Sequence, residues 1–226
     1  MHPFAHRPAR LLALLGVFLA AAASTAACGG SPASPSTPVT YDIGNAATSI
    51  TSLPSLSEML DEKTMGSATA PNTVIVYSSF TCSYCADFHL HSFPQLKSQY
   101  IDAGTVRYVF RDWERGTLDI HAAMLARCAG DARYFDAVDT LFRNQPSWAG
   151  AGDQALVNVM RQFGMSQQVI DTCLATTALS DAIVKSHNDA VNKYSVAGTP
   201  TFVVNEKSCV AGDYGLAPIV ACFDPK

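Results

Sequence analysis

The chain has 226 residues, of which 48% are hydrophobic and 15% charged, a balance typical of a globular protein and not of a disordered one. Its formal net charge is −4 and no stretch is rich in Lys and Arg, which argues against a nucleic-acid partner. The seven cysteines are an odd number that needs an explanation if the protein is exported.

Residues 1–27 have the order of a secretory signal peptide. Arg7 and Arg10 precede an apolar run over residues 11–20, which is too short for a membrane span, and small residues follow. Residues 25–28 (TAAC) also resemble a lipobox, in which Cys28 would carry lipid, although Thr25 stands where leucine is usual. Ordinary cleavage near residue 27 is the alternative. Both predict export to a compartment where disulfides persist.

Residues 28–57 are predicted to be a Pro- and Ser-rich tether with a weakly structured lead-in. The stretch 29–38 (GGSPASPSTP) has no periodicity to bury and could hold a domain away from a membrane surface. One short element is expected around residues 56–60.

A β–α–β unit is predicted from residue 73 onward. Residues 73–79 form a β-branched strand, residues 85–100 a helix that Pro94 should kink, and residues 106–111 an alternating strand. A right-handed crossover makes the two strands parallel.

A helical block is expected over residues 118–178, interrupted by glycines and a proline. Apolar residues then recur at helical spacing, at Ile183, Val184, His187, Ala190, Val191 and Tyr194. A hairpin of residues 201–204 and 208–210, turning near residues 205–206, and a helix over 216–223 complete the chain. This order predicts an α/β protein, a thioredoxin-like core in residues 58–116 and 180–226 with a helical insertion at 117–179.

The pair Cys82 and Cys85, separated by Ser83 and Tyr84, lies where the first strand passes into its helix. A helix start supplies partial positive charge and free N–H groups, which favour the thiolate of the first cysteine. The thiolate is the attacking species in thiol–disulfide exchange. The spacing alone is also used by zinc sites.

A zinc or copper site would need His89 and His91 beside the two cysteines. On a helix, however, His91 lies about 200° around the axis from His89, so the four side chains cannot converge. No second cysteine pair has metal spacing. We therefore predict no metal and interpret both histidines as helix-surface residues.

Residues 80–85 (FTCSYC) together with 196–202 (VAGTPTF) resemble the DsbA family of bacterial thiol–disulfide oxidoreductases. Residues 126–130 (ARCAG) and 171–174 (DTCL) are similar to its alphaproteobacterial branch. The resemblance covers residues 64–212. It implies a thioredoxin fold with a helical insertion and oxidation of exported client proteins.

The resemblance also implies roles for four residues. Cys82 would be the nucleophile and Cys85 the more buried resolving thiol. Pro200 would be the cis-proline beside the site, and Thr199 would turn its backbone toward the dithiol to pair with a client chain. An ordinary turn proline is the alternative.

Three positions depart from the family pattern. Ser83 stands where proline is usual, and Tyr84 where the strongest oxidases have histidine. Because the residues between the cysteines tune thiolate stability, we predict a less oxidising site than those oxidases have. Val76 stands where many relatives have a buried acid that relays a proton, so that relay is absent or supplied from elsewhere.

The remaining cysteines are expected to form structural disulfides if Cys28 carries lipid. Cys128–Cys173 would staple the insertion and stabilise the fold by about 3–4 kcal/mol through the unfolded chain. Cys209–Cys222, which has less family support, would join the hairpin to the last helix. Free buried thiols and crossed links such as Cys128 to Cys209 are the alternatives.

The sequence therefore predicts a monomeric, periplasmic oxidoreductase that needs no organic cofactor and is anchored through Cys28. It would donate the Cys82–Cys85 disulfide to reduced or misfolded client proteins and be reoxidised by a membrane partner. One alternative is a reductase or isomerase kept reduced by a membrane donor, although residues 28–70 are too short and Pro-rich for the dimerisation domain that isomerases usually carry. The other is a tethered metal-binding or chaperone module.

Overall fold

The computed structural model describes residues 49–211 and 214–223. The expected signal peptide, Cys28 and the tether up to residue 48 lie outside the described residues. The described residues all belong to one compact unit, which contains the cysteine pair.

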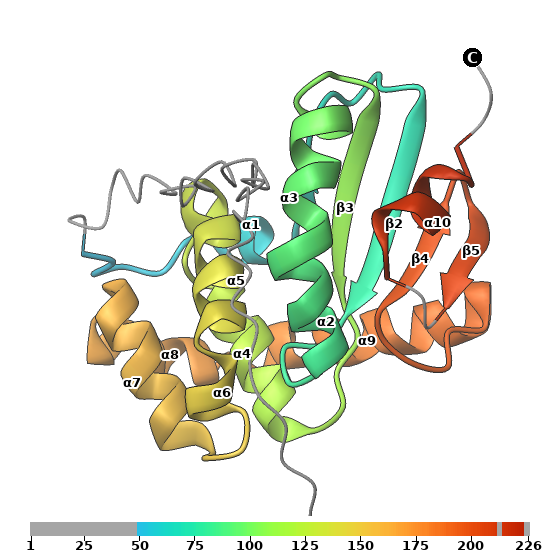
Figure 1. Ribbon diagram of the computed structural model, residues 1–226. Helices are drawn as coiled ribbons and strands as arrows, with labels where there is room; N and C mark the ends of the chain where they lie inside the picture. Colours follow the sequence, from blue (N-terminus) through green and yellow to red (C-terminus); the bar gives the residue numbers. More distant parts are fainter. Residues whose placement is uncertain (1–48, 212–213, 224–226) are drawn as a thin grey trace, which may run out of the picture. The chain divides into compact units, whose positions relative to one another are not determined.

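A five-stranded mixed sheet forms the centre of this unit, with the strand order β1-β3-β2-β4-β5 (Figure 1). Its strands are β1 Lys63–Met65, β2 Asn72–Ser78, β3 Val106–Asp112, β4 Thr201–Val204 and β5 Lys207–Ala211. Strands β2 and β3 are parallel, as predicted, and the other neighbours are antiparallel. This sheet, its helices and the insertion confirm the predicted α/β thioredoxin fold.

The helix after β2 is longer and less regular than the sequence predicts. It runs through α2 Ser83–Asp87, a π-helical turn Phe88–Ser92, α3 Phe93–Leu96 and a second π-helical turn Lys97–Ile101. The first π turn ends just before Pro94, whose missing N–H cannot continue the ordinary α-helical ladder. The helix lies across one face of the sheet (Figure 1).

The predicted helical block is present as five helices that gather beside the sheet (Figure 1). They are α4 Thr117–Arg127, α5 Tyr134–Arg143, α6 Gln145–Trp148, α7 Asp153–Phe163 and α8 Gln167–Leu174, with a short 3₁₀ turn at Asp131–Arg133. Their apolar side chains and those of the helix after β2 form one continuous core with the face of the sheet that this helix covers. The insertion is therefore packed into the same core as the sheet.

Helix α9, Thr177–Tyr194, covers the opposite face of the sheet, where Ala190 packs with Ile75, Tyr77 and Val109. The apolar face predicted for this helix was partly wrong, because Val184 and Val191 are 37% and 41% exposed. The buried stripe of α9 is narrower and runs through Leu179, Ile183 and Ala190.

The remaining elements flank the sheet. Helix α1, Leu56–Leu60, confirms the short element expected there, and α10, Leu216–Val220, is shorter than predicted. The hairpin turns at Asn205 and Glu206, whose φ angles of 49° and 64° fit a type I′ turn. Strand β1 was not predicted, since three residues are too few for a periodic signal.

Two disulfides join these elements. Cys128 at the end of α4 is bonded to Cys173 in α8, and Cys209 in β5 is bonded to Cys222 after α10. Both pairs have Cα atoms 6.2 Å apart. Within residues 49–211 and 214–223, no helix has the length and apolar character needed to cross a membrane.

Candidate active site

The two cysteines of the motif lie at the carboxyl end of β2, where the chain enters α2. Cys82 is the N-cap of α2 and Cys85 lies in its first turn, so the helix begins two residues earlier than predicted. Both are free thiols and nearly enclosed, at 4% and 1% exposure. Tyr84 between them is 59% exposed.

The environment of Cys82 favours its thiolate. A hydrogen bond from Cys85 lowers the pKa of Cys82 to about 5, and Thr199 and the backbone N–H groups of Cys85 and Tyr84 act in the same direction. Burial opposes this shift but does not overcome it. At neutral pH Cys82 is therefore ionised, the form that attacks and leaves in thiol–disulfide exchange.

Cys85 has the opposite environment. Burial raises the pKa of its thiol far above the usual range, and the neighbouring Cys82 thiolate raises it further. Cys85 thus keeps its proton and donates it to Cys82. The pair is asymmetric, with an ionised sulfur on Cys82 and a protonated sulfur on Cys85.

The loop before β4 completes the site. The peptide bond between Thr199 and Pro200 is cis, and the Thr199 carbonyl oxygen lies 3.4 Å from Sγ of Cys82. A groove of about 500 Å³ runs beside this loop, lined by residues 195–201 together with Tyr84, Ser208 and Tyr214. The geometry fits an extended peptide that reaches Cys82 along the Thr199 backbone.

The model of the thioredoxin family matches residues 59–213, more than half of the chain. The chain belongs to the thioredoxin family. Two curated relatives, provisionally named as protein-disulfide oxidoreductases, come from Rickettsia felis and Rickettsia bellii, each 29% identical over 73% of this chain. The chain spans 59% and 65% of the length of these two relatives.

Solved structures place this thioredoxin-family protein near the DsbA group. Wolbachia pipientis alpha-DsbA1 is 28% identical, with a TM-score of 0.64 over 76% of this chain and 91% of that one. A protein-disulfide isomerase from Novosphingobium aromaticivorans, 24% identical over 73% of this chain and 98% of that one with a TM-score of 0.65, shares the fold. The thioredoxin-family protein is thus DsbA-like, as its motifs predict.

Sequence reasoning missed three side chains at this site. Tyr214 packs its ring against Tyr84, with centroids 5.3 Å apart. Asp119 of α4 and Gln145 of α6 are buried and bind the loop that leads to Cys82. An acid in the first turn of a predicted helix and an amide before a proline are weak signals, and only the tertiary fold brings them to the cysteines.

The interpretation of His89 as a surface residue was wrong. Its ring is 6% exposed, stacks on Phe93 with centroids 5.1 Å apart and points Nε2 toward Asp139 at 3.4 Å. The π turn carries it inward between the helix and α5. His91 is exposed, as expected, and pairs with Asp87. Among the described residues, no group of three or more His, Cys, Asp or Glu side chains is arranged to hold a metal.

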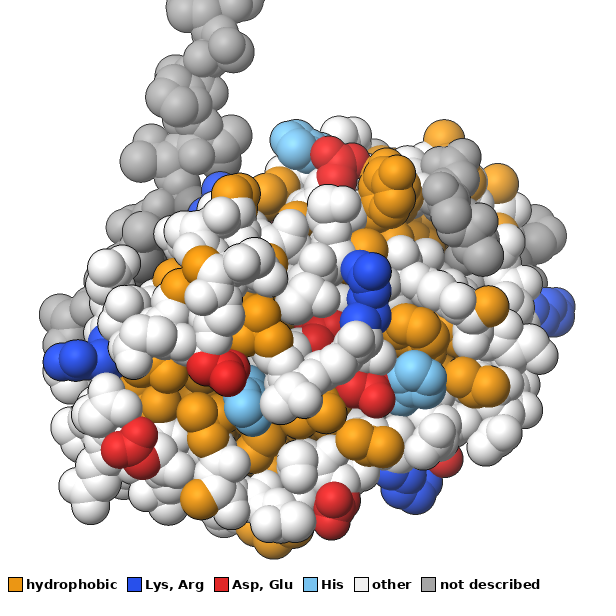
Figure 2. All heavy atoms as spheres, turned by 90° about the horizontal axis from the view of Figure 1, so that it is seen from below, with side chains coloured by type: hydrophobic (Ala, Val, Ile, Leu, Met, Phe, Trp, Pro, Cys, Tyr) orange, Lys and Arg blue, Asp and Glu red, His pale blue; other side chains and the backbone are white. Residues whose placement is uncertain are grey.

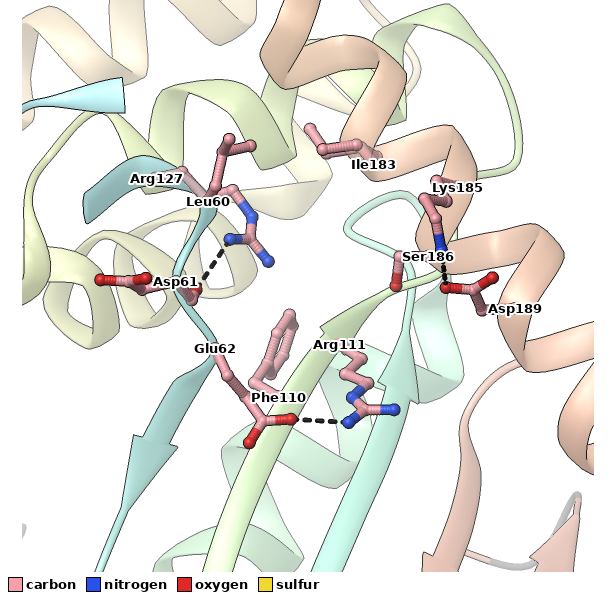
Figure 3. A pocket seen from close by; sticks show the side chains of 11 residues that line it. Leu60, Asp61, Glu62, Phe110, Arg111, Arg127, Ile183, Lys185, Ser186 and Asp189 are labelled. Atoms are coloured by element: carbon pink, nitrogen blue, oxygen red, sulfur yellow. Dashed lines mark hydrogen bonds and ion pairs between the residues drawn. The ribbon is translucent and has the colours of Figure 1, made fainter. Parts of the chain in front are cut away.

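A second groove, of about 270 Å³, lies between residues 60–62, the end of β3 and α9 (Figure 3). Its charged side chains bind one another: Arg111 pairs with Glu62, and Lys185 with Asp189. Arg127 points to the Asp61 carbonyl oxygen and pairs with the buried Asp112. Arg111 thus ties β3 to Glu62, which lies between α1 and β1.

Figure 2 views the protein from the end toward which β2 and β3 run, the end that carries the dithiol. Hydrophobic side chains are spread across this face, with few Lys and Arg side chains among them.

Proposed function

We propose that this protein is an exported protein-disulfide oxidoreductase that donates a Cys82–Cys85 disulfide to client proteins. The observation that carries the proposal is the asymmetry of the pair. Cys82 has a pKa of about 5 and faces the Thr199 carbonyl beside the cis-proline, whereas Cys85 is buried and protonated. Curated relatives named as protein-disulfide oxidoreductases support the same chemistry.

The reaction proceeds through a mixed disulfide. A client thiolate attacks Sγ of Cys82 in the oxidised protein, and the sulfur of Cys85 leaves and takes up a proton because burial disfavours its thiolate. A second client thiolate then attacks the client sulfur, and Cys82 leaves as a stable thiolate. The client has lost two electrons, which the dithiol now holds and passes to a membrane partner.

The groove beside Thr199 is the proposed client site. An extended segment would pair with the Thr199 backbone and bring its cysteine to Cys82, while its side chains contact Tyr84 and Tyr214. Backbone pairing does not depend on sequence, which suits an enzyme that meets many reduced or misfolded clients.

We further propose a moderate oxidising power. Ser83 and Tyr84 replace the residues that the strongest oxidases carry between their cysteines, and Val76, fully buried, supplies no acid behind Cys85. A less stabilised reduced form makes a weaker oxidant. The periplasmic location, the lipid on Cys28 and the monomeric state remain part of the proposal.

The test is client oxidation together with the in vivo redox state. The oxidised protein should form disulfides in a reduced, unfolded ribonuclease, and a Cys82→Ala variant should not. Trapping thiols with a maleimide in cells should find Cys82 and Cys85 mostly oxidised. A mostly reduced pair would favour the reductase or isomerase, and client binding that survives Cys82→Ala together with stoichiometric metal would favour the tethered module.

A further inference from the structure

The loop of residues 79–82, which leads from β2 to the nucleophile, is held by two side chains of the insertion. Asp119 comes from the first turn of α4 and Gln145 from the start of α6. Their exposed fractions are 3% and 8%, so both are taken out of water. Burying a polar side chain is costly unless it makes hydrogen bonds, and both side chains form hydrogen bonds with this loop.

Asp119 binds the donors of the loop. Oδ1 accepts from the backbone N–H of Phe80 at 2.7 Å and of Thr81 at 3.3 Å. Oδ2 accepts from the hydroxyls of Ser79 and Thr81, and from the N–H of Arg115 at 3.0 Å. Burial raises the pKa of Asp119, and the hydrogen bonds from Ser79 and Phe80 oppose that rise. Because these groups all donate, they favour the carboxylate form.

Gln145 binds the acceptors of the same loop. Its Nε2 donates to the carbonyl oxygen of Phe80 at 2.7 Å and to that of Cys82 at 3.0 Å. The carboxylate and the amide thus complement each other, one taking the N–H groups and the other the C=O groups. Together they fix the path of four residues that belong to neither β2 nor α2.

This loop sets the surroundings of both sulfurs. The N–H of Ser79 lies 3.5 Å from Sγ of Cys85, and the N–H of Cys82 donates to the Ser79 carbonyl oxygen at 3.2 Å. Cys82 has an extended backbone at the N-cap of α2, and the backbone N–H groups of Cys85 and Tyr84 at the start of that helix contribute to the lowered pKa of its thiol. A loop that relaxed would carry the sulfur away from these donors.

We propose that Asp119 and Gln145 are positioning residues that hold the loop of residues 79–82 and thereby stabilise the Cys82 thiolate. The insertion then tunes the dithiol as well as covering it. The importance of the thiolate for exchange rests on the proposed function, but the geometry of the loop does not. The proposal also has a definite sign. A negative charge destabilises a nearby thiolate, so if Asp119 acted only through its charge, removing it would lower the pKa of Cys82. If Asp119 positions the loop, removing it raises that pKa.

The experiment follows alkylation of Cys82 by iodoacetamide against pH in the reduced full-length protein, with the modified peptide identified by mass. The wild-type midpoint should lie near 5. Asp119→Ala should raise the midpoint by about one pH unit. Asp119→Asn, which removes the charge but keeps an acceptor oxygen and the shape, should shift it less. A midpoint that falls in Asp119→Ala would show a charge effect and overturn the proposal.

Gln145→Met tests the same loop without touching a charge. It keeps the volume but leaves the carbonyl oxygens of Phe80 and Cys82 without their donor, so its midpoint should also rise. Asp112→Asn is the matched control, a buried carboxylate of β3 that pairs with Arg127 and should lower stability without moving the midpoint. Wild-type midpoints in both Asp119→Ala and Gln145→Met, with only a lower melting temperature, would reduce these residues to a structural role. A wild-type midpoint near 8.5 would instead contradict the proposed function.

Discussion

The sulfur of Cys82 lies 3.4 Å from the carbonyl oxygen of Thr199, although 117 residues separate the two in the chain. The contact joins the amino end of α2 to the loop that precedes β4. It brings the proposed nucleophile and the backbone that would receive a client to one edge of the sheet. The sheet therefore holds side by side the two segments to which we assign the chemistry and the client binding.

The reduction potential of the pair should depend on pH with a break near pH 5. Reduction adds two electrons and, above pH 5, one proton, because Cys82 stays ionised while Cys85 is protonated. The potential should therefore fall by about 30 mV per pH unit above pH 5 and by about 60 mV below it. Glutathione equilibration from pH 4 to 8 measures this, and a single slope of about 60 mV throughout would contradict the low pKa of Cys82.

The same pKa shift makes the stability of the reduced protein depend on pH. Cys82 is ionised above about pH 5 in the folded protein, but only above about pH 9 in the unfolded chain. The stabilisation is therefore fully present above pH 9, decreases as pH falls and is lost below about pH 5. Urea unfolding of the reduced protein at pH 5 and 7.5 should show the gain, and Cys82→Ser should remove it. Equal pH dependence in the two proteins would exclude this linkage.

The disulfide between α4 and α8 should carry much of the stability of the insertion. It closes a loop over 45 positions, and both cysteines are fully buried. The double variant Cys128→Ala and Cys173→Ala should lose about 3–4 kcal/mol of unfolding free energy. Urea unfolding of the oxidised protein gives this value. The comparison variant, Cys209→Ala and Cys222→Ala, removes a disulfide that closes a loop of only 13 positions. It should lose less unfolding free energy. Non-reducing peptide mapping that linked Cys128 to Cys209 would refute both pairings.

Arg127 should matter for stability far more than Arg107 does. Arg127 Nε lies 2.7 Å from a carboxylate oxygen of Asp112, which is 2% exposed, whereas Arg107 pairs with the exposed Glu62. Arg127→Ala leaves a buried charge without its partner and should cost about 3–5 kcal/mol. Arg107→Ala should cost less than about 1 kcal/mol. Similar losses in thermal unfolding would mean that the Asp112 site admits water.

His89 and His91 offer a matched pair on one π turn. His89→Ala removes a ring that stacks between Phe93 and Phe142 and should cost about 2 kcal/mol. His91→Ala removes a side chain that is 71% exposed and should change stability by less than about 0.5 kcal/mol. Denaturant unfolding measures both. A larger effect at His91 would contradict the inward turn of His89.

The sequence could predict what local patterns encode. The strand through Val76, the dithiol at a helix start and the hairpin after Pro200 each carry their signal within a few neighbouring residues. It could not predict the burial of His89, because a π turn changes which face of a helix points inward. It also could not place Asp119 and Gln145, since they reach Cys82 only through the packing of the insertion on the sheet. Strand β1 owes its existence to pairing with β3 and not to any pattern of its own.

The equilibrium reduction potential of the Cys82–Cys85 pair at pH 7 tests the central claim most directly. A disulfide donor of moderate strength should lie above the value of about −270 mV typical of thioredoxin and below about −120 mV, the value of the strongest oxidase. A value at or below about −270 mV would contradict the oxidase, because such a pair would be held reduced. A value near −120 mV would instead show that Ser83 and Tyr84 do not weaken the oxidant.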